Sequence, residues 1–365
     1  MKTVCEINKC NGCMACLEKC HVSAISIQDD LKFYNALIDT KKCVNCGLCA
    51  KVCPRKNESV AIQPRWWYQG WADPELRKCA SSGGVASALI RTFILQGGYV
   101  ASCLFNKGEF RFEVTNDVNT ARRFAGSKYV KSNPAGIYEK VQSLLKSNKK
   151  VLFIGLPCQV AAIKAFIKDT NNLVTVDLIC HGTPSPRLLT KCLSEYGYTI
   201  NNLSNVTFRS KNQYKLGTNN KPVAAFHTMD NYLIAFLHSM DYTENCYSCD
   251  YATLKRVSDI TLGDSWGTDL KHEEKKGVSL ILCQTETGKN LVENSELELL
   301  DVDFENAVLH NEQLNKPSKC SVFREQFFSN YEKKHHFGQA IFMTAPVLVA
   351  KEKIKAVIKY AISTI

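Results

Sequence analysis

The sequence predicts a multidomain chain that combines an α+β module at the N-terminus with an α/β domain behind it. Two four-cysteine runs with the same C-x2-C-x2-C-x3-C spacing, CNGCMACLEKC and CVNCGLCAKVC, occupy residues 10–53. From Lys149 onward the pattern changes to buried strands, tight turns and helices. The chain has 365 residues and exceeds the roughly 250–300 at which one hydrophobic core stops growing, which predicts two or more domains.

The two cysteine runs have the spacing of [4Fe-4S] ligands in bacterial two-cluster ferredoxins. In that arrangement the first three cysteines of a run hold one cluster and the fourth reaches the other cluster. The predicted ligand sets are therefore Cys10, Cys13, Cys16 and Cys53 for one cluster, and Cys43, Cys46, Cys49 and Cys20 for the second. Structural zinc usually takes two well-separated C-x2-C pairs, and disulfides need an oxidising compartment. Iron–sulfur ligation is the favoured interpretation.

Residues 1–62 contain an internal repeat, since VCEINKC and ALIDTKKC each lead into a cysteine run and a short apolar tail follows each run. Two copies of strand, loop, short helix and strand predict a bacterial-type 2[4Fe-4S] ferredoxin fold. Residues 63–78 follow, with Pro64 and Pro74 bracketing three tryptophans. We expect this segment to be a Trp-rich linker whose indoles pack the ferredoxin module onto the next domain, in preference to binding a ligand.

The next part, residues 79–150, begins with CASSGGVASALIRTFILQGG, in which Gly83 and Gly84 open an amphipathic helix. Serine and glycine before a helix leave backbone N–H groups and the positive end of the helix dipole free for an anion such as a phosphate. A plain N-cap by Ser82 explains the same residues equally well, and both interpretations stay open. The loop GSKYVKS adds Lys128, which is compatible with phosphate or with solvent.

Residues 151–320 have the pattern of an α/β domain. KVLFIGLPCQVAAIKAFI and LVTVDLICHGTPSP each predict a buried strand followed by a turn with a cysteine, Cys158 and Cys180, and Cys246 and Cys249 have ligand spacing. Loops after parallel strands lie along the edge where α/β proteins bind ligands. Each cysteine alone is more often a buried small hydrophobe. As a set, these four predict a third four-thiolate site, with an iron–sulfur cluster favoured over zinc. The remaining six cysteines, Cys5 among them, are expected to be packing residues.

The formal net charge of +11 comes from scattered lysines, without a cluster of arginines interleaved with aromatics. This disfavours nucleic acid and is typical of a basic surface that steers acidic partners. No window of 18 apolar residues exists and the N-terminus lacks an apolar export segment, so we expect a cytoplasmic protein. Residues 321–365 predict a helical tail. Its basic amphipathic helix from Val349 is expected to dock on its own domain or a partner, in preference to a weak membrane-surface contact.

Together these motifs resemble the coenzyme F420 hydrogenase/dehydrogenase beta-subunit family, here preceded by a ferredoxin domain. The segments that carry the resemblance are SSGGVASAL, GSKYVKS, FIGLPCQVAAIK, DLICHGTPSP and CYSCDYATLKRVSDITLGDSWG. The resemblance implies an FAD flavoprotein, in which 79–150 is the flavin-binding N-terminal part of the beta subunit and 151–320 its iron–sulfur and flavin domain. It further implies flavin pyrophosphate contacts by Ser81, Ser82, Gly83 and Gly84, a flavin or phosphate contact by Lys128, and a cluster nearest the flavin on Cys158, Cys180, Cys246 and Cys249.

No G-x-G-x-x-G follows a strand and no Walker lysine motif is present, which argues against nicotinamide and nucleoside triphosphate sites. We expect electrons from ferredoxin or a redox partner subunit to pass through 4Fe-4S clusters to FAD. The final acceptor would be a deazaflavin of the F420 type, as the resemblance implies for some relatives, or another small molecule. His181 and Asp264 lie on cluster-adjacent turns and are expected to deliver protons. Two alternatives remain, an electron-transfer subunit without its own substrate and a non-redox cluster-stabilised or sensor protein.

Overall fold

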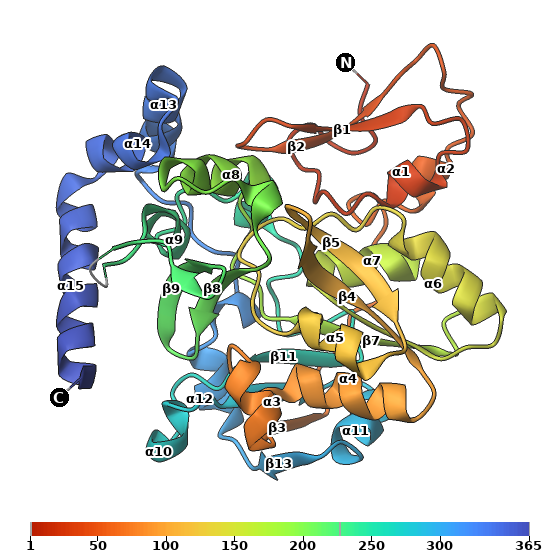
Figure 1. Cartoon of the computed structure of the whole chain (residues 1–365). Coiled ribbons are helices and arrows are strands. Elements are labelled where there is room, and N and C mark those ends of the chain that lie inside the picture. Colours follow the sequence, from red (N-terminus) through yellow and green to blue (C-terminus); the bar gives the residue numbers. More distant parts are fainter. Residues whose placement is uncertain (1, 226–227, 365) are drawn as a thin grey trace.

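The computed structural model describes residues 2–225 and 228–364. Its N-terminal module lies at one end of the molecule (Figure 1). Its elements are α1 (Ala15–Lys19), β1 (Ile25–Asp29), β2 (Tyr34–Ile38) and α2 (Leu48–Lys51). Strands β1 and β2 form an antiparallel hairpin. Each cysteine run turns at a glycine with positive φ, 68° at Gly12 and 73° at Gly47, which glycine adopts without steric cost. The module thus contains the two loop–helix units that the internal repeat predicts.

The centre of the molecule is an eight-stranded mixed sheet with the strand order β13-β3-β12-β11-β7-β6-β4-β5. Its strands are β3 (Trp66–Ala72), β4 (Tyr99–Asn106), β5 (Glu109–Thr115), β6 (Val151–Gly155), β7 (Leu173–Leu178), β11 (Ile260–Asp264), β12 (Ser279–Cys283) and β13 (Leu297–Leu300). Strands β4, β6, β7 and β11 run parallel to one another, and antiparallel strands flank them on both sides. This architecture confirms the predicted α/β domain. Because β4 pairs with β6, the boundary expected at residue 150 falls inside one sheet.

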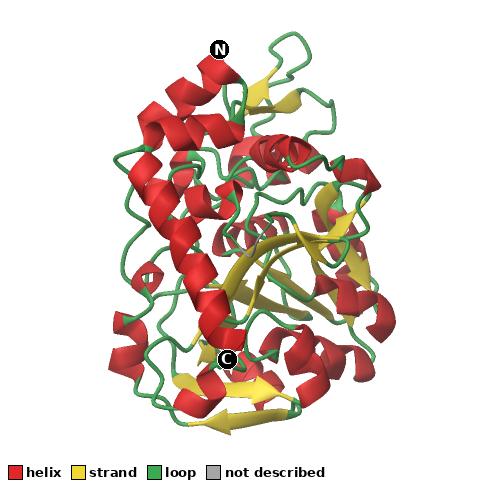
Figure 2. Ribbon diagram, turned by 60° about the vertical axis from the view of Figure 1, so that its left-hand side comes forward, coloured by secondary structure: helices red, strands yellow, loops and turns green. Residues whose placement is uncertain are grey.

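Helices cover both faces of this sheet (Figure 2). Consecutive residues of a strand point to opposite sides, so strands that are apolar throughout need cover on both faces. The covering helices are α4 (Val85–Leu95) and α11 (Glu286–Glu293) on one face, and α6 (Ile137–Lys146) and α7 (Pro157–Phe166) on the other. In β6, Leu152 and Ile154 pack in the core of the first pair, whereas Val151 and Phe153 pack in the core of the second. Buried residues of the N-terminal module belong to this second core, so the module is continuous with the α/β domain.

A third region joins a small sheet to several helices around its own core. Its elements are β8 (Val206–Ser210), β9 (Gln213–Thr218), β10 (Lys221–Pro222), α8 (Pro186–Glu195), α9 (Asn231–Leu237), α13 (Arg324–Lys334), α14 (Phe337–Thr344) and α15 (Pro346–Thr364). The remaining short elements are α3 (Pro74–Cys79), α5 (Val118–Ala121), α10 (Lys271–Glu274), α12 (Phe304–Leu309), η1 (Arg122–Phe124), η2 (Ile200–Asn202), η3 (Glu244–Ser248) and η4 (Glu312–Leu314).

The segment 63–78 is not the linker that the sequence suggests. Residues Trp66–Ala72 form β3, which lies between β12 and β13 inside the large sheet. The three indoles pack within this domain: Trp66 lies beside Lys289, Trp67 stacks on Phe304 at 4.3 Å, and Trp71 lies 4.5 Å from the Arg77 guanidinium. The prolines therefore bracket an aromatic, β-prone strand, and the indoles do not join the two modules.

The predicted C-terminal tail forms α13, α14 and α15, and the last of these runs along the side of the third region (Figure 1). One face of α15 docks on the protein, with Val349 buried and the Lys359 ammonium donating to the Asn212 carbonyl. The opposite face leaves Val347, Ile354 and Ile358 exposed. In the described residues, no helix combines the length and apolar character that a bilayer crossing requires.

Candidate cluster and cofactor sites

The predicted ligands of the first cluster, Cys10, Cys13, Cys16 and Cys53, are buried and line one cavity. Burial raises the pKa of the Cys13 and Cys16 thiols, so free thiolates would be unstable here without positive charge. Cys5 lies in the same cavity, and its thiol hydrogen-bonds to Cys10 and Cys53 and lowers the pKa of both. The sequence suggests Cys5 only as a packing residue. The thiol set and its cavity fit a cluster whose irons supply that charge.

The predicted ligands of the second cluster have different surroundings. Cys49 is close enough to Cys20 and Cys43 to interact with them electrostatically, and burial raises its pKa. Cys46 is exposed. In residues 2–225 and 228–364, no three His, Cys, Asp or Glu side chains converge on a position for a single metal ion. The first run thus lies against the α/β domain, whereas the second run faces solvent.

The four cysteines predicted to form a third site come from three separate segments of the chain. Cys158 lies in the first turn of α7, Cys180 follows β7, and Cys246 and Cys249 lie in and directly after η3. Cys180 interacts electrostatically with the other three, and Cys158 interacts with Cys246 and Cys249. Burial raises the pKa of Cys158 to about 12 and that of Cys249 to about 11. The fold thus brings these thiols within electrostatic range of one another from positions far apart in the sequence.

A buried ion pair anchors the loop after Cys249. The Arg256 guanidinium donates to both carboxylate oxygens of Asp177 on β7, at 3.1–3.3 Å, and to the carbonyl oxygens of Leu178 and Tyr251. Both charged side chains are at most 1% exposed. Because this pair joins the third cysteine loop to the sheet, it fixes where Cys249 lies relative to Cys180.

The first-run loop lies against the third cysteine set. Asn11, next to Cys10, accepts a hydrogen bond from Asn245, the neighbour of Cys246, at 3.4 Å, and its carbonyl accepts from the Lys131 ammonium at 3.2 Å. The Tyr138 hydroxyl donates to the Cys13 carbonyl at 2.6 Å. Tyr138 also lies within electrostatic range of both Cys13 and Cys158. The inner cluster position of the module and the third site are therefore neighbours.

A cavity of about 360 Å³ lies at the carboxyl ends of β6, β7 and β11, the edge where α/β proteins bind ligands. Its wall includes Ser81, Ser82, Gly84, Lys128, Cys180, His181 and Asp264, and the aromatic residues Tyr129, Tyr214, Phe236 and Trp266. The cavity thus contains most of the residues that the sequence assigns to flavin binding and proton delivery. It also contains one of the predicted third-cluster ligands.

The N-terminus of α4 opens into this cavity without a side-chain cap. Gly84 precedes the helix with a φ of 87°, and no side chain accepts from the first helical N–H groups. The Ser82 hydroxyl donates instead to the Val278 carbonyl, and the Ser81 hydroxyl accepts from the Ser127 N–H. The plain N-cap by Ser82 is therefore not formed, and free N–H groups at this terminus favour an anion.

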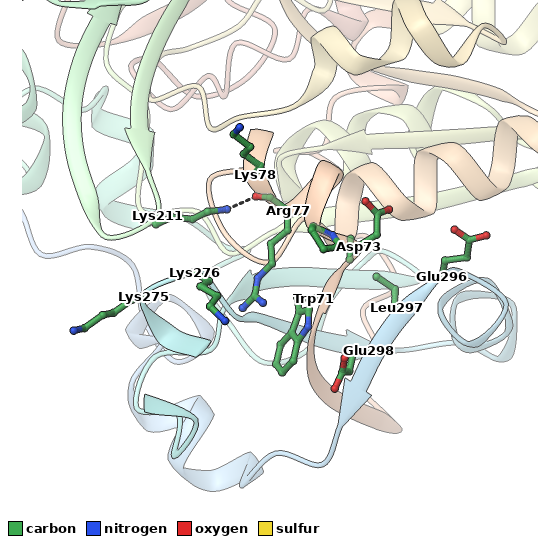
Figure 3. Close-up of a pocket in the computed structure, with 12 residues that line it drawn as sticks. Trp71, Asp73, Arg77, Lys78, Lys211, Lys275, Lys276, Glu296, Leu297 and Glu298 are labelled. Carbon is green, nitrogen blue, oxygen red and sulfur yellow. Dashed lines mark hydrogen bonds between the residues drawn. The ribbon is translucent and has the colours of Figure 1, made fainter. Parts of the chain in front are cut away.

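Close packing holds the segment before α4 in place. A Cβ atom on Gly83 would come within 2.5 Å of the Gly70 carbonyl oxygen, so only glycine fits against β3. On the other side, the Lys211 ammonium at the β8–β9 turn donates to the carbonyls of Arg77, Ala80 and Ser82. Figure 3 shows the contact between Lys211 and Arg77 in the wall of a separate pocket, which β3, α3 and β13 line. The approach to the helix N-terminus is thereby rigid.

Lys128 lines the cavity, but its ammonium is occupied. It donates to the carbonyl oxygens of Phe124, Ala125 and Gly126 at 2.6–2.9 Å. Burial lowers its pKa to about 8. In this arrangement Lys128 shapes its own loop, and a direct contact with flavin or phosphate stays a prediction.

The two predicted proton-delivering residues differ in their freedom. Both oxygens of Asp264 accept from the Arg209 guanidinium, at 2.6 and 2.7 Å, and Arg209 also lies over the rings of Tyr214 and Trp266. His181 lines the cavity, and desolvation by the surrounding protein lowers its pKa. His181 is therefore the freer of the two to exchange a proton. No motif marks Arg209 in the sequence, since its partner lies on a distant strand.

Two family models match this chain. Residues 148–303 match the C-terminal region of the coenzyme F420 hydrogenase/dehydrogenase beta subunit, and residues 9–57 match the 4Fe-4S dicluster domain. Over residues 148–303 the chain is therefore similar to the beta subunits of this family. Its beta-subunit region spans the third cysteine set, and its dicluster domain spans both cysteine runs. These matches confirm the resemblance to the beta-subunit family and the ferredoxin module that the sequence predicts.

Individual relatives match parts of the chain. An uncharacterized protein of Methanocaldococcus jannaschii is 23% identical over 233 residues, and the match covers 53% of this chain and 64% of that protein. One subunit of the ion-translocating oxidoreductase complex of Methanosarcina acetivorans is 41% identical over 56 residues, 15% of this chain and 19% of that protein. The matched regions span less than two thirds of either relative. A solved chain of the xenon-derivatized F420-reducing [NiFe] hydrogenase complex from Methanosarcina barkeri overlaps 75% of this chain and 94% of its own length, with a TM-score of 0.47 and 17% identity.

Proposed function

We propose that this beta-subunit relative is an iron–sulfur flavoprotein oxidoreductase. It would take electrons from ferredoxin or a partner subunit through three [4Fe-4S] clusters to FAD and on to an organic acceptor. One observation carries the proposal: a single cavity has the uncapped N-terminus of α4 in one wall and the Cys180–His181 turn in another. A ligand with a pyrophosphate and a redox-active ring suits such a wall, because N–H groups bind the anion and aromatic side chains pack against the ring.

FAD, when bound, would exchange single electrons with clusters and a hydride with an organic molecule. The chain's own residues have simpler tasks. The free N–H groups at the start of α4 bind the anionic part of the ligand, and Gly83 and Lys211 keep that terminus in position. Tyr214 and Trp266 exclude water from the cavity wall. His181 holds or releases a proton at its ring nitrogen, and Asp264 orients Arg209.

The contacts of the first-run loop support an order for the electron path. Cys13 lies near Tyr138 and Tyr251, which both lie near Cys158, and Asn11 bonds to Asn245. The position of the first cluster is thus nearest to the third cysteine set. The second run lies farther out, with Cys46 exposed. Electrons would pass from the second run to the first, to the third set and then to the cavity.

The acceptor is proposed only as a class, a deazaflavin of the F420 type or another small organic molecule that fits beside the flavin ring. A second candidate function is an electron-transfer subunit with no substrate of its own. The 41% identity of the dicluster segment to one subunit of a redox complex favours this second candidate. Steady turnover of a small acceptor by the isolated chain would exclude it.

Anaerobic purification with quantitation of flavin, iron and sulfide per chain tests the proposal. We expect about one FAD and about twelve irons, because three clusters carry four irons each. The variant Cys180→Ser should lose about four irons and keep the other eight, whereas Cys320→Ser, which changes an exposed thiol, should lose none. About eight irons and no flavin in the unmodified chain would refute the third cluster and the flavin site together.

A further inference from the structure

The two cysteine runs of the ferredoxin module differ sharply in what covers them. The first-run loop is held against the α/β domain by Lys131 and Tyr138, and the Glu18 carboxylate accepts from the Gly136 N–H at the start of α6. In the second run, by contrast, every residue of 41–47 except Cys43 is exposed, and Val44 presents 59% of its surface. A protein that approaches from solvent therefore reaches the second-run loop and not the first.

The charge around the second run is predominantly positive, with Asp39 and Glu58 at its two ends. Residues 40–57 contain the five cations Lys41, Lys42, Lys51, Arg55 and Lys56 and no acidic residue. Arg55 pairs with Asp250, and the four lysines are exposed and form no ion pair within the described residues. Lys2 adds a further ammonium, because it donates to Asn45 at 2.9 Å. An apolar Val44 with a rim of unpaired lysines is the composition of a docking surface for an acidic protein.

We propose that the exposed second-run loop, with its rim of Lys2, Lys41, Lys42, Lys51 and Lys56, is the docking surface for a small acidic protein that carries one electron. The proposal rests on the electron path proposed above. In each encounter the carrier loses one electron, and the cluster position of the second run gains it. No bond forms and no proton moves. Such encounters bury little area and depend on electrostatic steering, which the lysine rim supplies.

The test compares two pairs of charge reversals in the cluster-loaded chain. Lys41→Glu/Lys42→Glu changes the proposed rim, and Lys333→Glu/Lys334→Glu makes the same change in total charge at the end of α13, on the far side from α2 in Figure 1. A reduced, acidic bacterial ferredoxin is mixed with each variant, and the bleaching of cluster absorbance is followed by stopped flow. Calorimetric titration with the same ferredoxin measures its binding.

At low ionic strength, we expect ferredoxin to reduce the rim variant at least about tenfold more slowly than the unmodified chain. This difference in rate should shrink as added salt screens the charges. The control variant should stay within about twofold of the unmodified chain. Val44→Ser, which changes no charge, should weaken ferredoxin binding at every salt concentration. Equal rates for the two charge-reversal variants, or a reduction rate that does not depend on salt, would overturn the proposal.

These readouts need neither flavin nor an organic acceptor. A chain without flavin in which the rim variant still loses its fast reduction would support this docking surface and refute the proposed oxidoreductase. If the chain holds one flavin and twelve irons but both charge-reversal variants are reduced at the same rate, the proposed oxidoreductase is supported and the docking surface is refuted. Equal reduction of all variants by an uncharged small reductant shows that the clusters themselves are intact.

Discussion

The buried pair of Arg256 and Asp177 allows a quantitative test of how the third cysteine loop is held. Asp177→Asn leaves the guanidinium buried without a counter-charge, and Arg256→Met leaves the carboxylate in the same state. Removing one partner of a buried pair costs about 3–5 kcal/mol, because the remaining charge keeps its desolvation penalty. The side chains here are 0% and 1% exposed, so each single variant should fall in that range.

The double variant Asp177→Asn/Arg256→Met removes both charges. We expect its cost to be smaller than the sum of the two single costs by at least about 2 kcal/mol. For 365 residues that unfold together, an unfolding entropy near 0.8 kcal/mol/K converts each single cost into a Tm decrease of roughly 4–6 °C. Scanning calorimetry of the chain under anaerobic conditions measures these shifts in Tm. Iron analysis reports whether the third cysteine set still binds its iron.

Additive costs in this cycle would refute the reasoning, since they would mean that the two charges do not compensate each other. The Arg256→Met and double variants should also lose about four irons, because the guanidinium donates to the Tyr251 carbonyl beside Cys249. Full iron content in both would show that the loop holds its position without this anchor.

Three further results are expected. Gly83→Ala should lower flavin content at least about tenfold, because the new Cβ would meet the Gly70 carbonyl oxygen. The control Ser87→Ala, which changes the same cavity wall, should retain its flavin. Equal flavin content in the two variants would contradict the packing argument. The free energy of unfolding should rise between about pH 8 and 10.5, because Lys128 has a pKa of about 8 in the folded chain and near 10.5 in the unfolded chain, and the folded chain therefore binds fewer protons in this range. Lys128→Met should reduce this rise in denaturant titrations at several pH values. An unchanged profile would exclude Lys128 as its source. His181→Gln should lower the turnover of the acceptor about 100-fold or more and remove one limb of the pH–rate profile. Flavin and iron should stay bound in this variant. Unchanged turnover would exclude proton delivery by His181.

The sequence predicts local chemistry well in this protein. The cysteine runs identify the ferredoxin module because their ligands lie within eleven consecutive residues and the thiolate spacing itself is the signal. The strand–turn–helix segments around Cys158 and Cys180 likewise predict the edge at which the cavity lies. Arg209 could not be found in this way, since it meets Asp264 from 55 residues away and no local pattern marks the pair.

The segment WWYQGWA shows why other elements could not be assigned. Two prolines and three indoles are as compatible with a linker as with a strand. The choice is made by β12 and β13, whose residues lie more than 200 positions later and pair with Trp66–Ala72 on both sides. Capping is a similar case: Ser82 is a good N-cap by type, but its hydroxyl is drawn to the Val278 carbonyl instead. In both cases partners distant in the chain decide between locally equal conformations.

The continuity of the ferredoxin module with the α/β domain has a consequence for the lifetime of the protein. Val4, Cys13 and Cys53 share one core with Tyr138 and Phe153, so the packing of α6 and α7 depends on the conformation of the first-run loop. A chain that has not acquired its first cluster leaves four buried thiols protonated and without the iron that would join them, and one face of the central sheet then opens more readily. Proteases act on such open states, so the amount of this protein in a cell should follow the supply of iron even when its synthesis is constant.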